Sequence, residues 1–440
     1  MLDPFRPNIK DQANLNTYTS EEKARRDAGK RNKDFYYDNQ EKYVSTFNIE
    51  AKPSILPLAR PILDKRTSML YNKKLTRDIR GPVASVNFLE ALYSENDIDN
   101  IFLSADLYSE LTGTVLLSMV EDTEKTSGYR ITLWDGTNIS AVSDDSNSSS
   151  LAALSLIKEV SSLSKEASHK DNIQVKTVTH QQIWTKERVF YYEGFTEKNS
   201  VDNEYKRIPF SVIKGKEVPN QFYGFSPATS ISLMNATINQ LVSDLTYTIK
   251  LQSANPIVLT GFQGGESLIV QPGKAINLPV GADAKILPFK PQIEDTLNTI
   301  KFIEQKIYET SSVPEVSIVG SEGSSGRELL VRWYPLVQVF LEKAVRYQKY
   351  ELEAANNFLF MAGFEPIQSI HVNYDKNSIL PLNPEEDKLK EDVSLNLTNP
   401  AKILRERDPH LTEQEAAAII KKNKETNSGL ENQDKNSNKE

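Results

Sequence analysis

The stretch FSPATSISLMNATINQLVSDLTYTIKLQSANP, from Phe225 to Pro256, decides the fold. Ser226 followed by Pro227 is a favourable helix start, because serine caps free amides and proline suits the first helical position. The apolar residues that follow recur at spacings of three and four, which predicts one amphipathic helix; they are Ile231, Met234, Ile238, Leu241, Leu245 and Ile249. The helix must end near Asn255, since the residue before a proline disfavours helical geometry.

A second helix is predicted to run back alongside the first. Residues 257–289 are punctuated by glycine and proline and rich in valine and isoleucine, which indicates short strands and tight turns. From Ile293 to Ile307 apolar residues again recur at helical spacing. The pattern therefore predicts an antiparallel helix pair with a small β tip, each helix being about 30 Å long at ~1.5 Å per residue.

The first helix of this pair carries almost no charge. Between Ser226 and Ser253 only Asp244 and Lys250 are ionised, so much of the helix circumference is expected to be covered. Two arrangements remain open. Identical copies in a ring can cover it by a head-to-tail contact that closes by rotation, or a monomer can cover it with its own remaining residues.

After the helix pair, the sequence predicts a loop and a very long helix. Residues 313–326 are rich in glycine, which indicates a flexible loop. Ser325-Gly-Arg-Glu328 matches a capping box that opens a helix ending near Gly363. Pro335 predicts a kink in that helix about one turn earlier. Further short helices are expected to begin at Asn383-Pro384, Asn399-Pro400 and Thr412.

The N-terminal half is predicted to be helical first and β-rich afterwards. Helical spacing recurs over residues 53–75, where Pro61 predicts a break or kink, and again over residues 87–117. From about 114 to 214 alternating apolar and polar residues predict strands. A short helix over residues 151–163 is expected to interrupt this sheet.

Composition limits the classes of protein to which the chain can belong. Its 440 residues have a net charge of −8 and no cysteine, which excludes disulfides and thiolate metal sites. Proteins that bind DNA tightly usually present a basic face, and this chain as a whole is acidic. No apolar run approaches the ~18 residues of a membrane-spanning helix. The charged run over residues 21–31 fits either an extended arm or a surface helix, and no secretion signal is expected.

No catalytic constellation is visible. The four histidines, His169, His180, His371 and His410, do not lie at metal-ligand spacings from one another. The glycine-rich loop ending at Gly326 precedes a helix, but Arg327 follows it where a phosphate-binding P-loop has Lys-Ser or Lys-Thr. The sequence therefore predicts a protein that is not an enzyme and has no cofactor, although an enzyme with an unfamiliar site stays a weaker alternative.

Several phrases, in their order, resemble the portal proteins of tailed double-stranded DNA bacteriophages, the subunits of the head–tail connector. They are RIPFSVIKG from Arg207, FYGFS from Phe222, SANPIVLTG from Ser253 and QPG from Gln271. These are similar to the family's approach to its stem helix, to the exit of that helix into the clip and to the clip hairpin. The glycine-rich loop lies where the family carries its tunnel loop.

The resemblance implies an α+β portal fold with a mixed α/β wing, an antiparallel two-helix stem, a small β-rich clip, a long kinked wing helix and a C-terminal helical crown. The expected regions are an N-terminal arm (1–30), the wing (31–225), stem helix 1 (226–254), the clip (255–291), stem helix 2 (292–312), the tunnel loop (313–326), the long wing helix (327–363), the crown (364–425) and a disordered tail (426–440).

By the same resemblance, about twelve copies would form a ring around a channel for DNA packaging and ejection. The expected partners are other copies of the chain, double-stranded DNA without sequence specificity, the terminase motor, the head–tail adaptor, the major capsid protein and the scaffold, with no membrane. The ring would lie at a capsid vertex of the virion, after assembly in the host cytoplasm. The alternative is another phage or host ring or connector protein with a helical-hairpin stem.

Candidate contact residues follow from these regions. Those expected to face DNA in the tunnel loop are Val316, Ile318, Val319, Ser321 and Glu322. Those expected in the stem, to contact either DNA or a neighbouring subunit, are Lys250, Lys301 and Lys306. Those expected in the clip to dock partners are Gln263, Glu266, Lys274 and Lys285.

Overall fold

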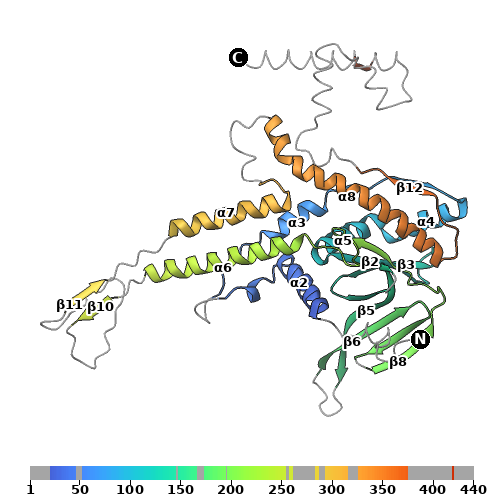
Figure 1. The fold of residues 1–440 in the computed structure, drawn as a ribbon, viewed down its shortest axis with the longest axis horizontal. Coiled ribbons are helices and arrows are strands. Elements are labelled where there is room, and N and C mark those ends of the chain that lie inside the picture. The colour runs from blue at the N-terminus through green and yellow to red at the C-terminus, as the bar shows by residue number, and fades with distance from the viewer. Residues whose placement is uncertain are drawn as a thin grey trace, which may run out of the picture. The chain divides into compact units, whose positions relative to one another are not determined.

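The computed structural model describes residues 20–45, 52–144, 147–165, 173–194, 196–253, 257–260, 283–286, 293–315, 326–374 and 419–420 (Figure 1). The chain divides into two compact units. The first comprises Met1–Glu322 and Arg332–Ser378, and the second comprises Gly323–Val331 and Ile379–Glu440. The architecture below is that of the first unit, to which all its elements belong except the first residues of the longest helix.

Helices precede the sheets along the chain, as the sequence predicts. They are α2 (Ser20–Tyr36), the short 3-10 helix η2 (Glu41–Tyr43), α3 (Ala59–Thr67), α4 (Val83–Asn96) and α5 (Ile98–Thr112). The charged run over residues 21–31 is thus helical and lies in α2, which buries Phe35 and packs against α5.

Two helix predictions in this part need correction. The helix expected over 53–75 is only α3, and the expected break at Pro61 is wrong, because Pro61 lies in the first turn, where the missing amide has no helical partner to lose. The helix expected over 87–117 is two helices, which meet at Asp97 in a left-handed conformation with φ 50°. The second helix ends at Gly113, whose φ is 82°.

Two antiparallel sheets follow. The smaller has the order β3–β2–β9, built from β2 (Thr114–Glu121), β3 (Tyr129–Asp135) and β9 (Ser211–Lys214). The larger has the order β4–β5–β6–β7–β8, built from β4 (Ile139–Asp144), β5 (Asn147–Lys165), β6 (Ile173–Thr185), β7 (Arg188–Glu193) and β8 (Thr196–Asp202). Both sheets fall within the range predicted to be β-rich.

The helix expected over residues 151–163 is wrong, because this segment lies inside strand β5. β5 pairs with β4 on one side and with β6 on the other, so that Leu156 stands opposite both Ile139 and Gln182. Ladders on both sides and burial of Ala153 and Leu154 outweigh the helical preference of Ala, Leu, Lys and Glu in this segment.

The α6–α7 hairpin follows the sheets, as the sequence predicts. Helix α6 (Ala228–Ser253) and helix α7 (Ile293–Ser311) lie side by side in Figure 1 and agree closely with the helices expected over 226–254 and 292–312. Between them in sequence, β10 (Ile257–Thr260) pairs antiparallel with β11 (Asp283–Ile286). We use the name hairpin for α6 and α7 together.

The long helix after the loop is α8 (Gly326–Met361), close to the expected 327–363. Pro335 lies inside α8, and the kink expected there stays a prediction. After α8 the chain returns to its N-terminal half, because β12 (Ser369–Val372) pairs antiparallel with β1 (Arg77–Arg80). The short helices expected beyond residue 383 and the tail lie outside the described residues.

Two apolar regions hold the first unit together. Between the sheets, Leu116, Ile139, Leu154, Leu156 and Phe222 form one buried cluster. In the helical part the largest buried side chains include Phe35, Phe102, Phe340, Tyr347 and Phe358. Among the described helices, none combines the length and the apolar character that crossing a lipid bilayer requires.

Candidate functional site

The hairpin buries one side of each helix and leaves another side open. On α7 Ile300 and Ile307 are buried, seven residues apart and therefore on one face. Phe302, on the opposite side of α7, is 59% exposed. On α6 Ile231 and Ile238 are buried in the apolar stripe that the sequence predicts. Apolar stripes of this kind bury against one another when two helices pack side by side, as α6 and α7 do.

A second stripe on α6 consists of amides and hydroxyls that hold an N-terminal segment. The Oδ1 of Asn235 accepts a hydrogen bond from the Ala59 amide at 3.0 Å, and the Oδ1 of Asn239 accepts one from the Leu56 amide at 2.9 Å. The Ser243 hydroxyl accepts a third, from the Ser54 amide at 2.9 Å. Side chains of α6 thus supply the hydrogen-bond acceptors that the backbone amides of this segment do not find in a neighbouring strand or helix.

The same stripe reaches residues further towards the N-terminus. Asn239 donates from Nδ2 to the Oε1 of Gln40 at 2.7 Å, and both side chains are buried. Gln240 donates to the Ser45 carbonyl at 2.8 Å and accepts from the Ser45 amide at 2.9 Å. The scarcity of charge on α6 therefore has a cause within one chain, because the N-terminal segment covers part of this helix.

The base of the hairpin is fixed to the last turn of α5. Just before α6, the Ser226 hydroxyl donates to the Glu110 carbonyl at 2.6 Å. Asn32 of α2 donates from Nδ2 to the Leu111 carbonyl at 2.9 Å and to the Thr229 hydroxyl of α6 at 3.0 Å. Three helices therefore converge where α6 begins.

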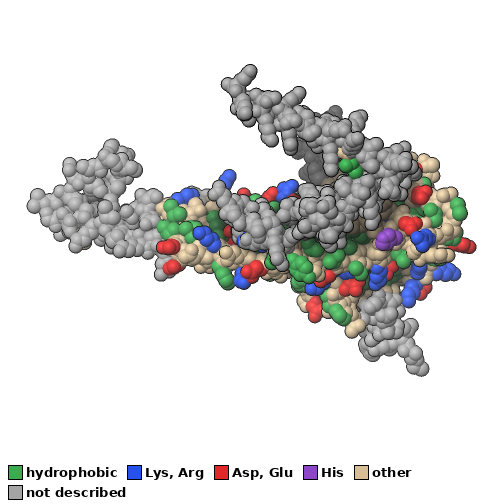
Figure 2. Space-filling view, turned by 90° about the horizontal axis from the view of Figure 1, so that it is seen from above, with side chains coloured by type: hydrophobic (Ala, Val, Ile, Leu, Met, Phe, Trp, Pro, Cys, Tyr) green, Lys and Arg blue, Asp and Glu red, His purple; other side chains and the backbone are tan. Residues whose placement is uncertain are grey.

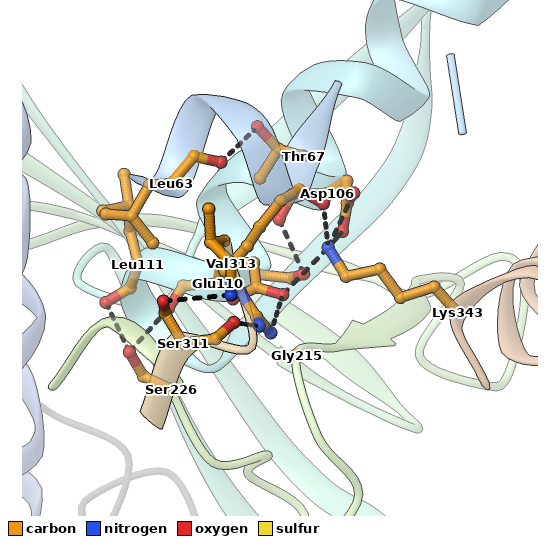
Figure 3. A network of polar contacts seen from close by, with 12 residues as sticks. Leu63, Thr67, Asp106, Glu110, Leu111, Gly215, Ser226, Ser311, Val313 and Lys343 are labelled. Carbon is orange, nitrogen blue, oxygen red and sulfur yellow. Dashed lines mark hydrogen bonds and ion pairs between the residues drawn. The ribbon is translucent and has the colours of Figure 1, made fainter. Parts of the chain in front are cut away.

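A buried cluster of two acids and two bases lies at the same place and joins the other leg of the hairpin (Figure 3). Glu110 accepts from Nε and Nη2 of Arg66, both at 3.1 Å, and its Oε1 lies 2.8 Å from the ammonium of Lys343. Arg66 also donates to the carbonyl of Ser311, the last residue of α7. Lys343, on α8, lies 2.9 Å from Asp106.

The cluster contains two acids and two bases, and its two acids have opposite pKa shifts. Burial by itself favours the neutral acid, but the charges of Lys343 and Arg66 lower the pKa of Glu110 to about 2. Burial raises the pKa of Asp106 above its ordinary value, and the negative charge of Glu110 adds to this despite the ammonium of Lys343. We call Arg66, Asp106, Glu110 and Lys343 the base cluster.

Sequence reasoning missed the base cluster. Asp106 and Glu110 lie four residues apart on the helix face that also carries Phe102 and Ser109, all of them buried. The sequence did carry one signal of the cluster, namely two carboxylates on the apolar side of a helix. Acids are rarely fully buried without partners, so these two positions indicate buried basic partners. The bases Arg66 and Lys343 come from distant parts of the chain and carry no local signal.

Beside the base cluster, a pocket of about 440 Å³ lies between the end of α7 and α8. Its lining is partly apolar and includes Tyr308, Val313, Pro314 and Pro335, with Gln305 and Arg332 among its polar residues. On α6 the side chain of Leu233 is 49% exposed. Neither the pocket nor the exposed leucine was expected from the sequence.

The predicted stem residues do not form one surface. Lys250, Lys301 and Lys306 are all exposed. Lys301 and Lys306 are five residues apart on α7 and therefore about 140° apart around it. Lys306 forms an ion pair with Glu309 at 2.5 Å within the same helix. This ion pair lies within one subunit, so the contact with DNA or with a neighbouring subunit that was expected for Lys306 stays a prediction.

Of the contact residues predicted in the clip and the tunnel loop, only Lys285 lies among the described residues. Lys285 lies in β11, where it stands opposite Val258 of β10. The remaining clip residues, Gln263, Glu266 and Lys274, lie outside the described residues, as do Val316, Ile318, Val319, Ser321 and Glu322 of the expected tunnel loop.

The described surface carries charges of both signs. Figure 2 shows acidic, basic and hydrophobic side chains interspersed on the face that it displays. Within the described residues, no group of three or more His, Asp or Glu side chains is placed to hold a metal ion. The positions that the structure describes therefore offer hydrophobic and polar contact surfaces.

The family model for "Phage portal protein, SPP1 Gp6-like" matches residues 15–428, which is most of the chain. The chain belongs to this family of phage portal proteins. The resemblance to portal proteins predicted from residues 207–363 is thereby confirmed, and the mixture of helices and antiparallel sheets in this portal chain is consistent with an α+β portal fold. No curated protein sequence matches the chain significantly.

Solved structures similar to this portal chain come from gene transfer agent particles. A chain of the native virion has a TM-score of 0.45 and 13% identity, and the match covers 79% of this chain and 87% of that one. A chain of the neck of the empty particle, computed with C6 symmetry, has a TM-score of 0.46 and 13% identity, with 78% and 88% covered. A chain of the native neck, computed with C12 symmetry, has a TM-score of 0.43 and 13% identity, with 79% and 87% covered. The family assignment itself rests on the family model.

Proposed function

We propose that copies of this chain form a ring, with about twelve subunits, whose channel carries double-stranded DNA into and out of a capsid. Membership of the portal family is the observation that carries this proposal. The open side of the hairpin supports it, because Leu233 and Phe302 are exposed on α6 and α7 although both are large and apolar. A ring of identical copies supplies contacts for such residues.

The hairpin is the proposed stem of the ring. In this assignment α6 and α7 are stem helices 1 and 2, residues 255–291 with the β10–β11 pair are the clip, and residues 313–326 are the tunnel loop. The wing comprises residues 31–225 and the long kinked helix 327–363, and residues 364–425 form the crown. Within the residues assigned to the crown, Ser369–Val372 pairs with β1 of the wing.

The channel should hold DNA loosely. Every phosphate that a protein neutralises adds affinity, so a strongly basic lining would resist sliding. The net charge of −8 and the ion pair between Lys306 and Glu309 fit a lining with few free positive charges. Val316, Ile318, Val319, Ser321 and Glu322 of the tunnel loop are the proposed DNA contacts, with Lys250 and Lys301 as weaker candidates in the stem.

The other surfaces are assigned to protein partners. The clip, with Gln263, Glu266, Lys274 and Lys285, would dock the terminase motor during packaging and the head–tail adaptor afterwards. The wing would contact the major capsid protein and scaffold at one vertex of the virion, after assembly in the host cytoplasm. In this proposal the chain is a structural subunit, and ATP hydrolysis belongs to the motor.

The mass and shape of the purified protein test the proposal. The chain has a mass of 49.7 kDa, so a ring of about twelve subunits should have a mass near 600 kDa in native mass spectrometry. Negative-stain electron microscopy should show annular particles with a central hole. A preparation that stays monomeric or dimeric at all concentrations, or that hydrolyses ATP, would contradict it.

A further inference from the structure

We propose that Leu233 of one subunit inserts into the pocket between α7 and α8 of the next subunit. This inference rests on the ring proposed above and names the contact that joins its subunits. It assigns a second copy of the chain to two features of the described residues, an exposed leucine on α6 and an open pocket beside α7.

The exposed side of α6 has the composition of an interface centre. Leu233 is 49% exposed, and Thr237, one turn further along, is exposed as well. The nearest ionised residue on this side is Asp244, which accepts a hydrogen bond from Gln240 at 3.0 Å. Interface centres are depleted of charge, whereas ordinary exposed helix faces carry it. A solvent-facing role does not explain a leucine on a side whose nearest charge lies about three turns away.

The pocket has the complementary chemistry. Val313, Pro314 and Pro335 provide apolar walls, and the ring of Tyr308 provides a flat one. Its volume of about 440 Å³ has room for a leucine side chain together with neighbouring groups. Polar and charged residues also line it, as expected of an anchor site in which a buried centre is surrounded by polar groups; they are Gln305, Glu309, Ser312, Glu315 and Arg332.

Leu233 lies at the level of Gln305, the outermost α7 residue of the pocket, while Val313 and Pro314 follow the end of α7 and lie nearer the base. Leu233 is five residues from the start of α6 at Ala228, and Gln305 is six residues from the end of α7 at Ser311. At 1.5 Å per residue, both lie about 8 to 9 Å from the base. If the hairpins of a ring stand parallel to its axis, these residues of neighbouring subunits meet at equal height.

The leucine and the pocket also lie on opposite faces of the hairpin. Helix α6 has three sides at 100° per residue: the apolar stripe towards α7, the Asn235–Asn239 stripe and the side with Leu233. Each side lies about 120° around the helix from the other two. Gln305 lies about 140° from Ile300 around α7. Because the helices are antiparallel, these angles place Gln305 on the face that carries the Asn235–Asn239 stripe and Leu233 on the other face.

Because they lie on opposite faces, Leu233 and the pocket cannot meet within one chain, but they can meet in a head-to-tail contact between two copies. Leu233 cannot reach the pocket of its own chain from the other face of the hairpin. A head-to-tail interface joins two different patches from opposite sides of each subunit and closes into a ring when the rotation fits. The two features therefore meet the requirement of a cyclic assembly.

Disulfide trapping tests this contact, and the absence of native cysteine makes the result easy to interpret. The assembled full-length double variant Leu233→Cys/Gln305→Cys is oxidised mildly and analysed on non-reducing gels. Disulfides form only where Cα atoms approach within about 7 Å. We expect a ladder of covalent oligomers that ends at the complete ring and disappears on reduction, whereas each single variant gives at most a dimer.

A second pair of cysteines controls for disulfides that form by random collision between rings or subunits. Thr310 is exposed near the same end of α7, about 140° around the helix from Gln305, and does not line the pocket. Leu233→Cys/Thr310→Cys should give no ladder. Intact rings that give no ladder with Gln305→Cys, or an equal ladder with Thr310→Cys, would overturn this contact and leave the ring proposal standing. Unsubstituted protein that forms no ring would overturn the ring proposal instead.

A charge substitution gives a second readout. Leu233→Asp places a carboxylate in the pocket, so we expect the concentration at which rings dissociate to rise at least about tenfold. Val83→Asp is the control, because Val83 is 75% exposed at the start of α4, outside the hairpin. Equal ring stability in the two variants, with folding verified by circular dichroism, would overturn the assignment of Leu233.

Discussion

Lys343 has an unusual environment for a lysine. Its side chain is 1% exposed, and its ammonium donates to the Arg66 carbonyl at 2.9 Å and to both oxygens of Asp106. With Glu110 Oε1 at 2.8 Å, four oxygens surround the three donors of the ammonium. A buried charge is tolerated only with such compensation, so the position of α8 relative to α3 and α5 is closely specified here.

Removal of the Lys343 charge should be costly. Lys343→Met leaves Asp106 without its cationic partner and Glu110 with only Arg66, and breaking a buried pair from one side costs about 3–5 kcal/mol. We expect the free energy of unfolding in urea to fall by that amount at a fixed protein concentration. Lys349→Met on the same helix is the control, since its pair with Glu353 is exposed and should contribute less than about 1 kcal/mol. Equal effects of the two changes would rule out a stabilising base cluster.

The pKa of Glu110 predicts a pH dependence. Its folded value of about 2 lies below the ordinary 4.5, so its charge stabilises the fold fully above pH 4.5, and this contribution is lost as the pH falls towards 2. Glu110→Gln resembles the protonated acid. The difference in unfolding free energy between the unsubstituted protein and this variant should therefore be about 3 kcal/mol at pH 7 and shrink below pH 4.5. A difference independent of pH would contradict the assigned charge.

At the scale of single elements, α6 combines two functions in one helix. Its apolar stripe pairs with α7, and its amide stripe holds residues 52–59 of the N-terminal segment. Asn239 is the centre of that stripe, because it contacts both the Leu56 amide and the side chain of Gln40.

Truncation of Asn239 should loosen the segment without melting the hairpin. Asn239→Ala leaves the Leu56 amide and the Oε1 of Gln40 without the hydrogen bonds that Asn239 makes to them, which costs about 1–3 kcal/mol. Limited proteolysis should then cut within residues 52–58 faster than in the unsubstituted protein. Asn298→Ala, an exposed amide on α7, is the matched control and should change neither quantity measurably. Unchanged cleavage in Asn239→Ala would show that the segment is held by other contacts.

The elements differ in how well the sequence predicts them. The bounds of α6 and α7 follow from local punctuation, namely Ser226-Pro227 at one end of α6 and Pro256 beyond the other, together with a clear 3.6-residue period. Strand β5 was mistaken for a helix because its preference is set by two neighbouring ladders, which are long-range. The split at Asp97 depends on a single left-handed residue that no pattern signals.

At the scale of the whole molecule, the order of elements allowed the family to be predicted, while its internal contacts could not be. The pairing of β12 with β1 and the meeting of Arg66 with Ser311 join residues far apart in sequence. Each participant is an ordinary strand or charge when taken alone. Side-chain packing across such separations is fixed only by the complete fold, which is why the base cluster and the pocket emerged only from the structure.

Both legs of the hairpin are attached at one end, through Ser226 and Ser311, to the last turn of α5 and its ion partners. Helix α6 has 26 residues and is therefore about 39 Å long. A tilt of about 5° at that attachment displaces its far end by about 3 Å, roughly the size of a water molecule. The hairpin is thus fixed at its base by a few buried charges and further along α6 by the amide stripe, and rearrangements at the base displace its distant end most.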